Sequence, residues 1–209
     1  MKNTVLLILA AFLAAAGCSS EPAEDPNTAE TSQAAGKQRK KAPDFTLQNY
    51  DGTEVSLSDY EGKIVVLEWF NYECPFVKYH YSKPMIMVNL ANKYLNKDVI
   101  WLRINSTAHQ KTDENRKFAR RHRIRGPILD DRSGQVGHMY KAKTTPHMFI
   151  IDRKGKIAYK GAIDNAPMGE TDGIIINYVN EALNEITRGV PVSRPETKPY
   201  GCSVKYAGP

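Results

Sequence analysis

Residues 64–70 form a nearly unbroken apolar run of β-branched, aliphatic and aromatic side chains, and this run restricts the possible folds more than any other feature. Such a run predicts a strand covered on both faces, as in the central sheet of an α/β protein. Shorter strand-like segments lie at residues 45–47, 54–57, 99–104, 148–151 and 156–161. Helical spacing is found over residues 75–96, 112–124 and 175–188. Pro84 should kink the first helix, and Thr112 is the predicted N-cap of the second. The alternation predicts an α/β sandwich with a mixed central sheet.

The amino terminus has the features of an export signal. Lys2 is followed by twelve apolar residues, 5–16, which are too few to span about 30 Å of hydrocarbon, and small residues then lead to Cys18. The arrangement resembles a bacterial lipoprotein signal, which implies a signal peptide over residues 1–17 and lipidation of Cys18. An ordinary cleaved signal peptide with an incidental cysteine is the alternative. We therefore expect a lipid-anchored protein on the periplasmic face of a bacterial cell envelope. Ser19 favours the outer membrane.

Composition divides the remaining chain into three parts. Residues 18–41 are polar and lack apolar periodicity, so they are expected to form a flexible tether. Residues 42–188 are the predicted folded domain, and residues 189–209 form a proline-containing tail. The net charge of +6 arises largely from six bases within residues 116–125. A solvated helix face is the simpler interpretation, and docking to anionic headgroups or an acidic partner is the alternative. Nucleic acid is not an expected partner outside the cytoplasm.

The chain has three cysteines, an odd number that cannot all pair within it. Lipidation would use Cys18 and leave Cys74 and Cys202 in an oxidising compartment. Cys74 follows the predicted buried strand and opens a helix with Pro75, where backbone N–H groups favour the reactive thiolate. A buried, inert cysteine is the alternative. Cys202 lies in the tail, which is long enough to reach back over the domain.

Four segments resemble the thioredoxin-like superfamily, especially its redoxin branch of AhpC/TSA and TlpA/ResA-like proteins. Residues 42–47 (Ala-Pro-Asp-Phe-Thr-Leu), followed by the Asp51-Gly52 turn, resemble the N-terminal redoxin hairpin. Residues 66–74 resemble the strand and turn before the first thioredoxin cysteine, and Thr145-Pro146 resembles the cis-proline of the active site. Residues 152–161 resemble the closing hairpin. The resemblance implies a thioredoxin-like three-layer sandwich, a mixed sheet flanked by helices, with an N-terminal β-hairpin extension.

The resemblance also implies roles for neighbouring residues. Glu68 lies six residues before Cys74, where thioredoxins carry a buried acid, so a raised pKa and a proton-transfer role are expected. A residue that faces water from an edge strand is the alternative. Thr145 and Pro146 would line the substrate site, together with Pro75. His147 is a candidate neighbour of that site, although a lone histidine is more often structural.

Two departures limit the resemblance. Val77 replaces the second cysteine of Cys-x-x-Cys, and Asn71 and Leu67 replace the hydroxyl residue and the proline of the peroxiredoxin motif. The chain resembles a peroxiredoxin-like group that has one cysteine at this site and a C-terminal Gly-Cys-Ser-x-Lys motif. Residues 201–205 match that motif.

The predicted function is therefore a membrane-anchored thiol-disulfide oxidoreductase or peroxiredoxin-like antioxidant protein. Cys74 would be the nucleophile and Cys202 the resolving thiol. The expected substrate is a protein thiol or disulfide, or a hydroperoxide, with an unidentified reductant and no cofactor. A permanent structural Cys74–Cys202 disulfide is one alternative. Another is a non-enzymatic module that binds copper or zinc through these cysteines, His80 and His147.

Overall fold

The computed structural model describes residues 39–82 and 85–208. The predicted signal peptide, Cys18 and nearly all of the predicted tether lie outside the described residues. Within them, no helix is long and apolar enough to cross a membrane.

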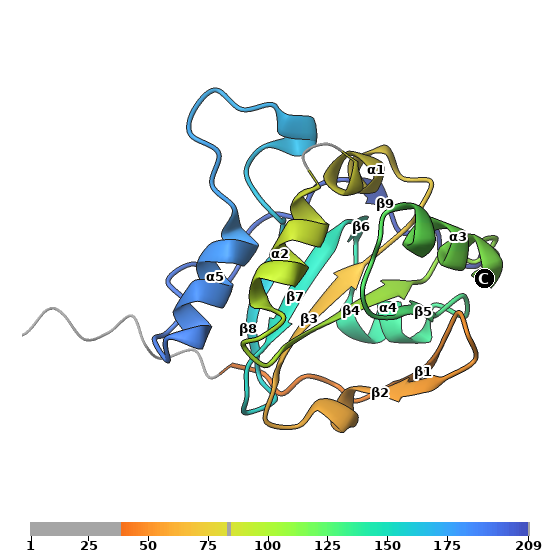
Figure 1. The fold of residues 1–209 in the computed structure, drawn as a ribbon, viewed down its shortest axis with the longest axis horizontal. Coiled ribbons are helices and arrows are strands. Elements are labelled where there is room, and N and C mark those ends of the chain that lie inside the picture. Colours follow the sequence, from red (N-terminus) through yellow and green to blue (C-terminus); the bar gives the residue numbers. More distant parts are fainter. Residues whose placement is uncertain (1–38, 83–84, 209) are drawn as a thin grey trace, which may run out of the picture. The chain divides into compact units, whose positions relative to one another are not determined.

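A seven-stranded mixed sheet forms the centre of the domain, in the strand order β2-β1-β5-β4-β3-β7-β8 (Figure 1). Strands β3, β4 and β5 are parallel, whereas β1, β2, β7 and β8 join through antiparallel pairs. The strands span Thr46–Asn49 (β1), Glu54–Ser56 (β2), Ile64–Trp69 (β3), Val99–Asn105 (β4), Ile128–Asp130 (β5), His147–Ile151 (β7) and Ile157–Gly161 (β8). A separate two-stranded sheet pairs β6, Thr144–Thr145, with β9, Cys202–Ser203.

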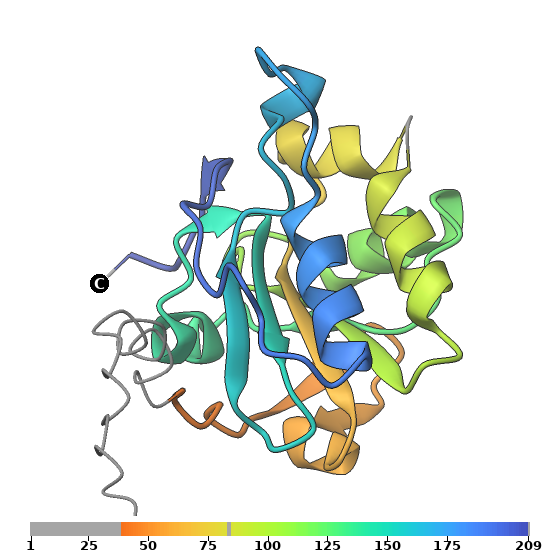
Figure 2. The ribbon, with the colours of Figure 1, turned by 90° about the vertical axis from the view of Figure 1, so that its left-hand side faces the viewer.

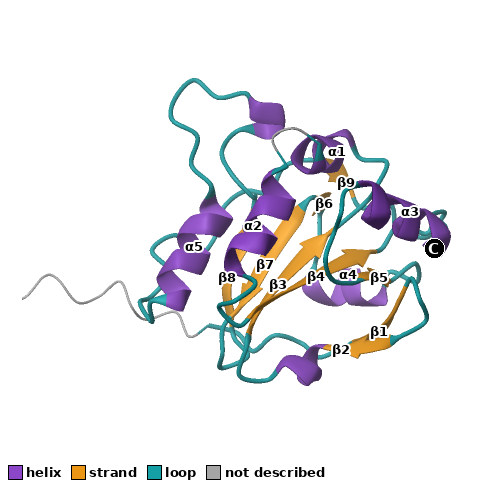
Figure 3. Cartoon of the chain, in the orientation of Figure 1, coloured by secondary structure: helices purple, strands orange, loops and turns teal. Residues whose placement is uncertain are grey.

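Helices cover both faces of the sheet, as Figure 3 shows. They span Pro75–Tyr81 (α1), Ile86–Tyr94 (α2), Thr112–Arg121 (α3), Gln135–Tyr140 (α4) and Tyr178–Thr187 (α5), with 3-10 turns at Leu57–Tyr60 and Pro167–Gly169. Alternate residues of β3 serve two cores, because successive strand side chains point to opposite faces. Ile64 and Val66 pack with α1, α2, α3 and α5, whereas Leu67 and Trp69 pack with α4. The predicted three-layer arrangement with an N-terminal hairpin is confirmed.

Two local predictions were wrong. The single kinked helix over residues 75–96 is two helices, α1 and α2, and Pro84 lies between them. Proline lacks an N–H group and disfavours helix in the preceding residue, which agrees with the end of α1 at Tyr81; the predicted kink at Pro84 itself lies outside the described residues. The N-cap of α3 is Lys111, because the Thr112 hydroxyl donates to Asp130 Oδ2 at 3.0 Å instead.

The tail after α5 lies against the domain (Figure 2, dark blue). It first follows the edge strand β8, where Lys160 and Glu196 form a parallel bridge. Thr197 N then donates to Lys160 O at 3.1 Å, and further along Val204 N donates to Lys143 O at 3.1 Å. These backbone hydrogen bonds bring the Cys202 segment to the carboxyl end of β3, where α1 begins.

Candidate active site

Cys74 is the N-cap of α1 and is placed there by the end of the buried strand β3. Pro75 occupies the first turn of the helix, where its missing N–H costs no hydrogen bond. Only 2% of Cys74 is exposed. Its Sγ lies 2.9 Å from Thr145 O and 3.0 Å from Cys202 Sγ. Two of the residues that the sequence singled out, 71 and 128 positions away, therefore meet at one sulfur atom.

The Thr145–Pro146 peptide bond is cis, and Thr145 lies opposite Cys202 in the antiparallel β6–β9 pair. Thr144 lies opposite Ser203 in the same pair. Because this ladder fixes the register of the tail, Cys202 is presented to Cys74 by backbone pairing rather than by a flexible side chain alone.

The tail and the domain fit closely at two glycines. Gly201 has a φ of +125°, and a Cβ there would overlap the carbonyl oxygen of Thr145. Gly137, inside α4, leaves room for the Tyr206 ring, whose hydroxyl donates to Ala142 O at 3.0 Å. The tail is therefore a fitted part of the domain on both sides of Cys202.

The two thiols have opposite electrostatic environments. Burial raises the pKa of Cys74, but its contacts with Cys202, Thr145 and the Val77 backbone together outweigh burial, so the net pKa is lower than that of an ordinary thiol. Burial, followed by the hydrogen bond to Cys74 and the charge on it, raises the pKa of Cys202 to about 11. Cys74 is thus the thiol with the greater tendency to ionise.

Glu68 is fully buried near the carboxyl end of β3, an interior strand of the sheet, which excludes the alternative of a water-facing edge residue. Burial raises the pKa of its carboxyl group against the opposing effect of Arg103, in the direction that the sequence predicted. Its carboxylate accepts hydrogen bonds from Tyr81 Oη at 2.7 Å and Trp101 Nε1 at 2.8 Å and lies 3.6 Å from Arg103 Nε. These contacts belong to a buried network on the face of the sheet that α1 covers, and the proton-transfer role of Glu68 stays a prediction.

His147 directly follows the cis-proline and is 95% buried, with its ring 4.5 Å from that of Phe149. Its Nδ1 accepts a hydrogen bond from Lys143 N at 3.3 Å, which braces the segment that carries Thr145. Burial, assisted by Lys143 and Lys160, lowers the pKa of His147 to about 4. The imidazole is therefore neutral at pH 7, and its contacts position the segment that carries Thr145.

Sequence reasoning did not identify a buried polar group that holds the tail beside Cys202. The Tyr200 hydroxyl donates to Asp164 Oδ1 at 2.6 Å and accepts from His80 Nε2 at 2.8 Å. Burial raises the pKa of Tyr200 far above the usual range, so the hydroxyl keeps its proton. Burial lowers the pKa of His80, with Asp164 opposing. The position of Tyr200 two residues before Cys202 was the only signal in the sequence.

Cys74 and Cys202 are in contact, but the two histidines proposed with them as metal ligands do not complete a site among the described residues. Across residues 39–82 and 85–208, no group of three or more His, Cys, Asp or Glu side chains has an arrangement that could hold a metal ion. His80 and His147 instead make the separate contacts described above.

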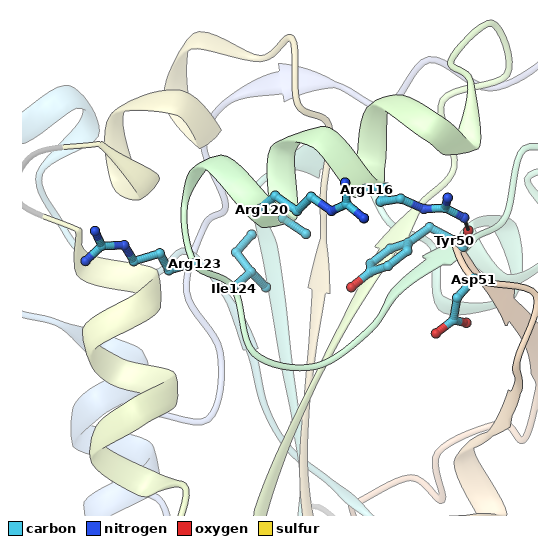
Figure 4. A pocket seen from close by; sticks show the side chains of 7 residues that line it. Tyr50, Asp51, Arg116, Arg120, Arg123 and Ile124 are labelled. Carbon is cyan, nitrogen blue, oxygen red and sulfur yellow. Dashed lines mark hydrogen bonds between the residues drawn. The ribbon is translucent and has the colours of Figure 1, made fainter.

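The basic segment of α3 lines a hollow of about 550 Å³ beside the hairpin turn (Figure 4). Arg116 is already engaged there, because its guanidinium donates to Tyr50 O at 2.7 Å. Arg123 points away from Arg116 and Arg120 (Figure 4). The arginines do not converge on one point, which fits the simpler interpretation of a solvated helix face.

Comparison with known proteins places this geometry in context. The family model described as the AhpC/TSA family matches residues 39–160. Thiol-disulfide oxidoreductase ResA of Geobacillus thermodenitrificans is 33% identical over 130 residues, which cover 62% of this chain and 70% of that protein. Thioredoxin-like protein YneN of Bacillus subtilis is 30% identical over 119 residues, covering 56% of this chain and 67% of that protein.

Solved structures share the fold over most of the chain. An uncharacterized conserved protein from Geobacillus kaustophilus superposes with a TM-score of 0.74 at 30% identity, covering 82% of this chain and 93% of that one. A hypothetical protein from Sinorhizobium meliloti gives a TM-score of 0.75 at 21% identity, covering 83% and 96%. The family match ends at Lys160, so the tail with Cys202 lies beyond it.

Proposed function

This chain belongs to the AhpC/TSA family, and from that membership and the contact between its two cysteines we propose that it is a thiol-disulfide oxidoreductase. The single observation that carries the proposal is the 3.0 Å separation of Cys74 Sγ and Cys202 Sγ, about 1 Å longer than a disulfide bond. A small movement of the tail suffices to form or break that bond. The relatives named as thiol-disulfide oxidoreductases support the same chemistry.

The reaction uses Cys74 as the nucleophile and Cys202 as the resolving thiol. The Cys74 thiolate attacks one sulfur of a substrate disulfide, so a Cys74–substrate disulfide forms and the first substrate thiolate leaves. Cys202 then attacks Cys74 Sγ, which forms the Cys74–Cys202 disulfide and releases the second substrate thiol. The substrate gains two electrons and two protons, and a separate dithiol reductant must return them to the protein.

Several features favour this order of events. The lowered pKa of Cys74 favours its thiolate form, whereas the raised pKa of Cys202 keeps that thiol protonated. The Thr145 carbonyl, 2.9 Å from Cys74 Sγ, belongs to the strand on which an extended substrate would pair. The position of the second cysteine in a Cys-x-x-Cys motif is occupied by Val77, which is fully buried in α1, so α1 offers no second thiol.

A protein disulfide suits this site better than a hydroperoxide. Asn71 stands where peroxiredoxins carry the hydroxyl that holds peroxide. Its amide oxygen already accepts from Gln110 Nε2 and Glu73 N, both at 2.7 Å. Reduced protein mixed with hydroperoxide should therefore consume it slowly, and rapid stoichiometric consumption that Cys74→Ser abolishes would establish the peroxidase instead.

Thiol labelling with mass spectrometry tests the proposal in a series of redox buffers. We expect Cys74 and Cys202 to become protected together near about −200 mV, a value typical of cycling pairs. A pair that stays oxidised below about −300 mV would be a structural disulfide, and the redox proposal would fail. Cys74→Ser should abolish disulfide reduction. Cys202→Ser should stop the reaction at the mixed disulfide.

We also propose that a lipid on Cys18 tethers the domain at the periplasmic face of the envelope, with the outer membrane favoured. Support comes from the lipoprotein-like signal alone, and two or more acyl chains give durable anchoring. Cells fed a labelled fatty acid should incorporate it into the wild-type protein. The Cys18→Ser variant should lose the label and leave the membrane fraction.

A further inference from the structure

The tail segment around Cys202 occupies the surface on which an extended polypeptide would pair with the Thr145 strand. Thr145 and Cys202 are directly opposite in an antiparallel ladder, and Cys202 Sγ points at Cys74 Sγ. An incoming strand that reacts with Cys74 needs the same edge and the same place for its own cysteine. The tail and such a partner therefore compete for one site.

The tail shows which side chains this surface accepts. Two residues before Cys202, the Tyr200 ring lies 5.9 Å from that of Phe76 and bonds through its hydroxyl to Asp164 and His80. Asp164 and His80 are 99% or more buried. Removing the tail would leave both polar groups without the Tyr200 hydroxyl, and an aromatic residue with a hydroxyl would restore the same bonds.

Contacts on both sides of this segment also hold the tail to the domain. Thr197 Oγ1 accepts from Ala162 N at 2.9 Å on one side, and the Tyr206 ring stacks on His138 at 4.0 Å on the other. Between them the ladder is only two residues long, and Ser203 is exposed. The segment can leave while its flanks keep it nearby, so it returns at high effective concentration.

We propose that tail residues 199–204 are an internal copy of the partner strand, and that the partner is an extended polypeptide with tyrosine two residues before its reactive cysteine. The inference rests on the proposed function and names the partner of the same site. The partner displaces the tail and pairs with Thr144 and Thr145. Its Tyr-x-Cys segment then places an aromatic hydroxyl between His80 and Asp164. When the tail returns, it brings Cys202 to the mixed disulfide and takes the place of the released partner.

Two synthetic peptides test this on the reduced mature chain. The first is acetyl-Pro-Tyr-Gly-Cys-Ser-Val-amide with thionitrobenzoate on its cysteine, and the second has alanine in place of tyrosine. Cys74 attacks the peptide sulfur, the peptide–thionitrobenzoate bond breaks, and the coloured thiolate is released without net oxidation. We expect the tyrosine peptide to react about tenfold faster, as two lost hydrogen bonds imply for the alanine peptide.

Variants of the tail sharpen the test. Tyr200→Ala empties the subsite, so the rate of the tyrosine peptide should rise several-fold while that of the alanine peptide rises less. Tyr200→Phe keeps the ring and its packing but loses both hydrogen bonds. This variant should still react faster with the tyrosine peptide than with the alanine peptide, but its rate with the tyrosine peptide should rise less than that of Tyr200→Ala. Circular dichroism checks that both variants are folded.

The outcomes separate this inference from the proposed function. Equal rates for the two peptides, or equal acceleration of both by Tyr200→Ala, would overturn the inference. The small disulfide dithionitrobenzoate, which needs no docking, reports the thiol chemistry alone. If it reacts with Cys74 while the peptides show no preference, only the inference fails. If Cys74 reacts with none of the three reagents, the proposed function fails as well.

Discussion

Acid should destabilise this domain through His147, the buried imidazole behind the candidate site. Its pKa is about 4 in the folded chain, against 6.5 for an ordinary histidine. Because the folded pKa is the lower one, the unfolded chain takes up the proton first as the pH falls. The stability contribution is fully present above about pH 6.5 and is lost progressively down to about pH 4. The loss from this residue alone is about 3 kcal/mol.

Urea unfolding monitored by circular dichroism, at intervals from pH 7 to pH 4, measures the contribution of His147 to the free energy of unfolding. Wild type and His147→Asn are compared at each pH. Asparagine is neutral and can still accept a hydrogen bond from Lys143 N, so the loss of stability that the substitution itself causes should not depend on pH. Wild type should lose about 3 kcal/mol more than the variant over that range. His138→Asn, on the exposed side of α4, controls for the loss of a histidine. Parallel curves for wild type and His147→Asn would refute the reasoning.

Three further outcomes follow from the contacts at the site. Gly201→Ala should accelerate alkylation of Cys74, because the added methyl group overlaps the Thr145 carbonyl and lifts the tail; an unchanged rate would contradict the fit. Glu68→Gln should lower the free energy of unfolding by about 3–5 kcal/mol, since it leaves Arg103 buried without its charged partner, and urea titration measures the loss. In reduced protein, mass-resolved alkylation should give Cys74 a pH midpoint below that of a free thiol and Cys202 one near about 11; the reverse order would exchange their roles.

Most of the elements that the sequence predicted are long enough to show a period or an unbroken apolar run, whereas the short strands β1 and β2 were marked by the Asp51-Gly52 turn between them. Strand β3 and helix α5 are examples of the longer elements. Strand β5 has three residues, α4 has six, and β6 and β9 have two each, so none of them completes a pattern that could be recognised. Their positions are set by tertiary pairing, which local sequence does not encode.

The site shows the same division between local and long-range information. That Cys74 opens a helix follows from its neighbours, and the reach of Cys202 follows from the length of the tail. The 3.0 Å contact depends on the register Thr145↔Cys202, which only the folded chain reveals. Glu68 is comparable, because its burial is visible in the apolar run but its partner Arg103 comes from the register of β3 against β4.

Placing the second thiol on a tail changes what controls the chemistry. In a Cys-x-x-Cys motif both sulfurs belong to one turn of helix, so their separation is nearly fixed. Here the separation depends on whether residues 199–204 are seated, and therefore on the Tyr200 hydrogen bonds and on the absence of a side chain at Gly201. Any change that weakens this seating lowers the effective concentration of Cys202 at Cys74. The stability of the Cys74–Cys202 disulfide should consequently follow the binding of the tail, and partner docking and redox potential become two measures of the same free energy.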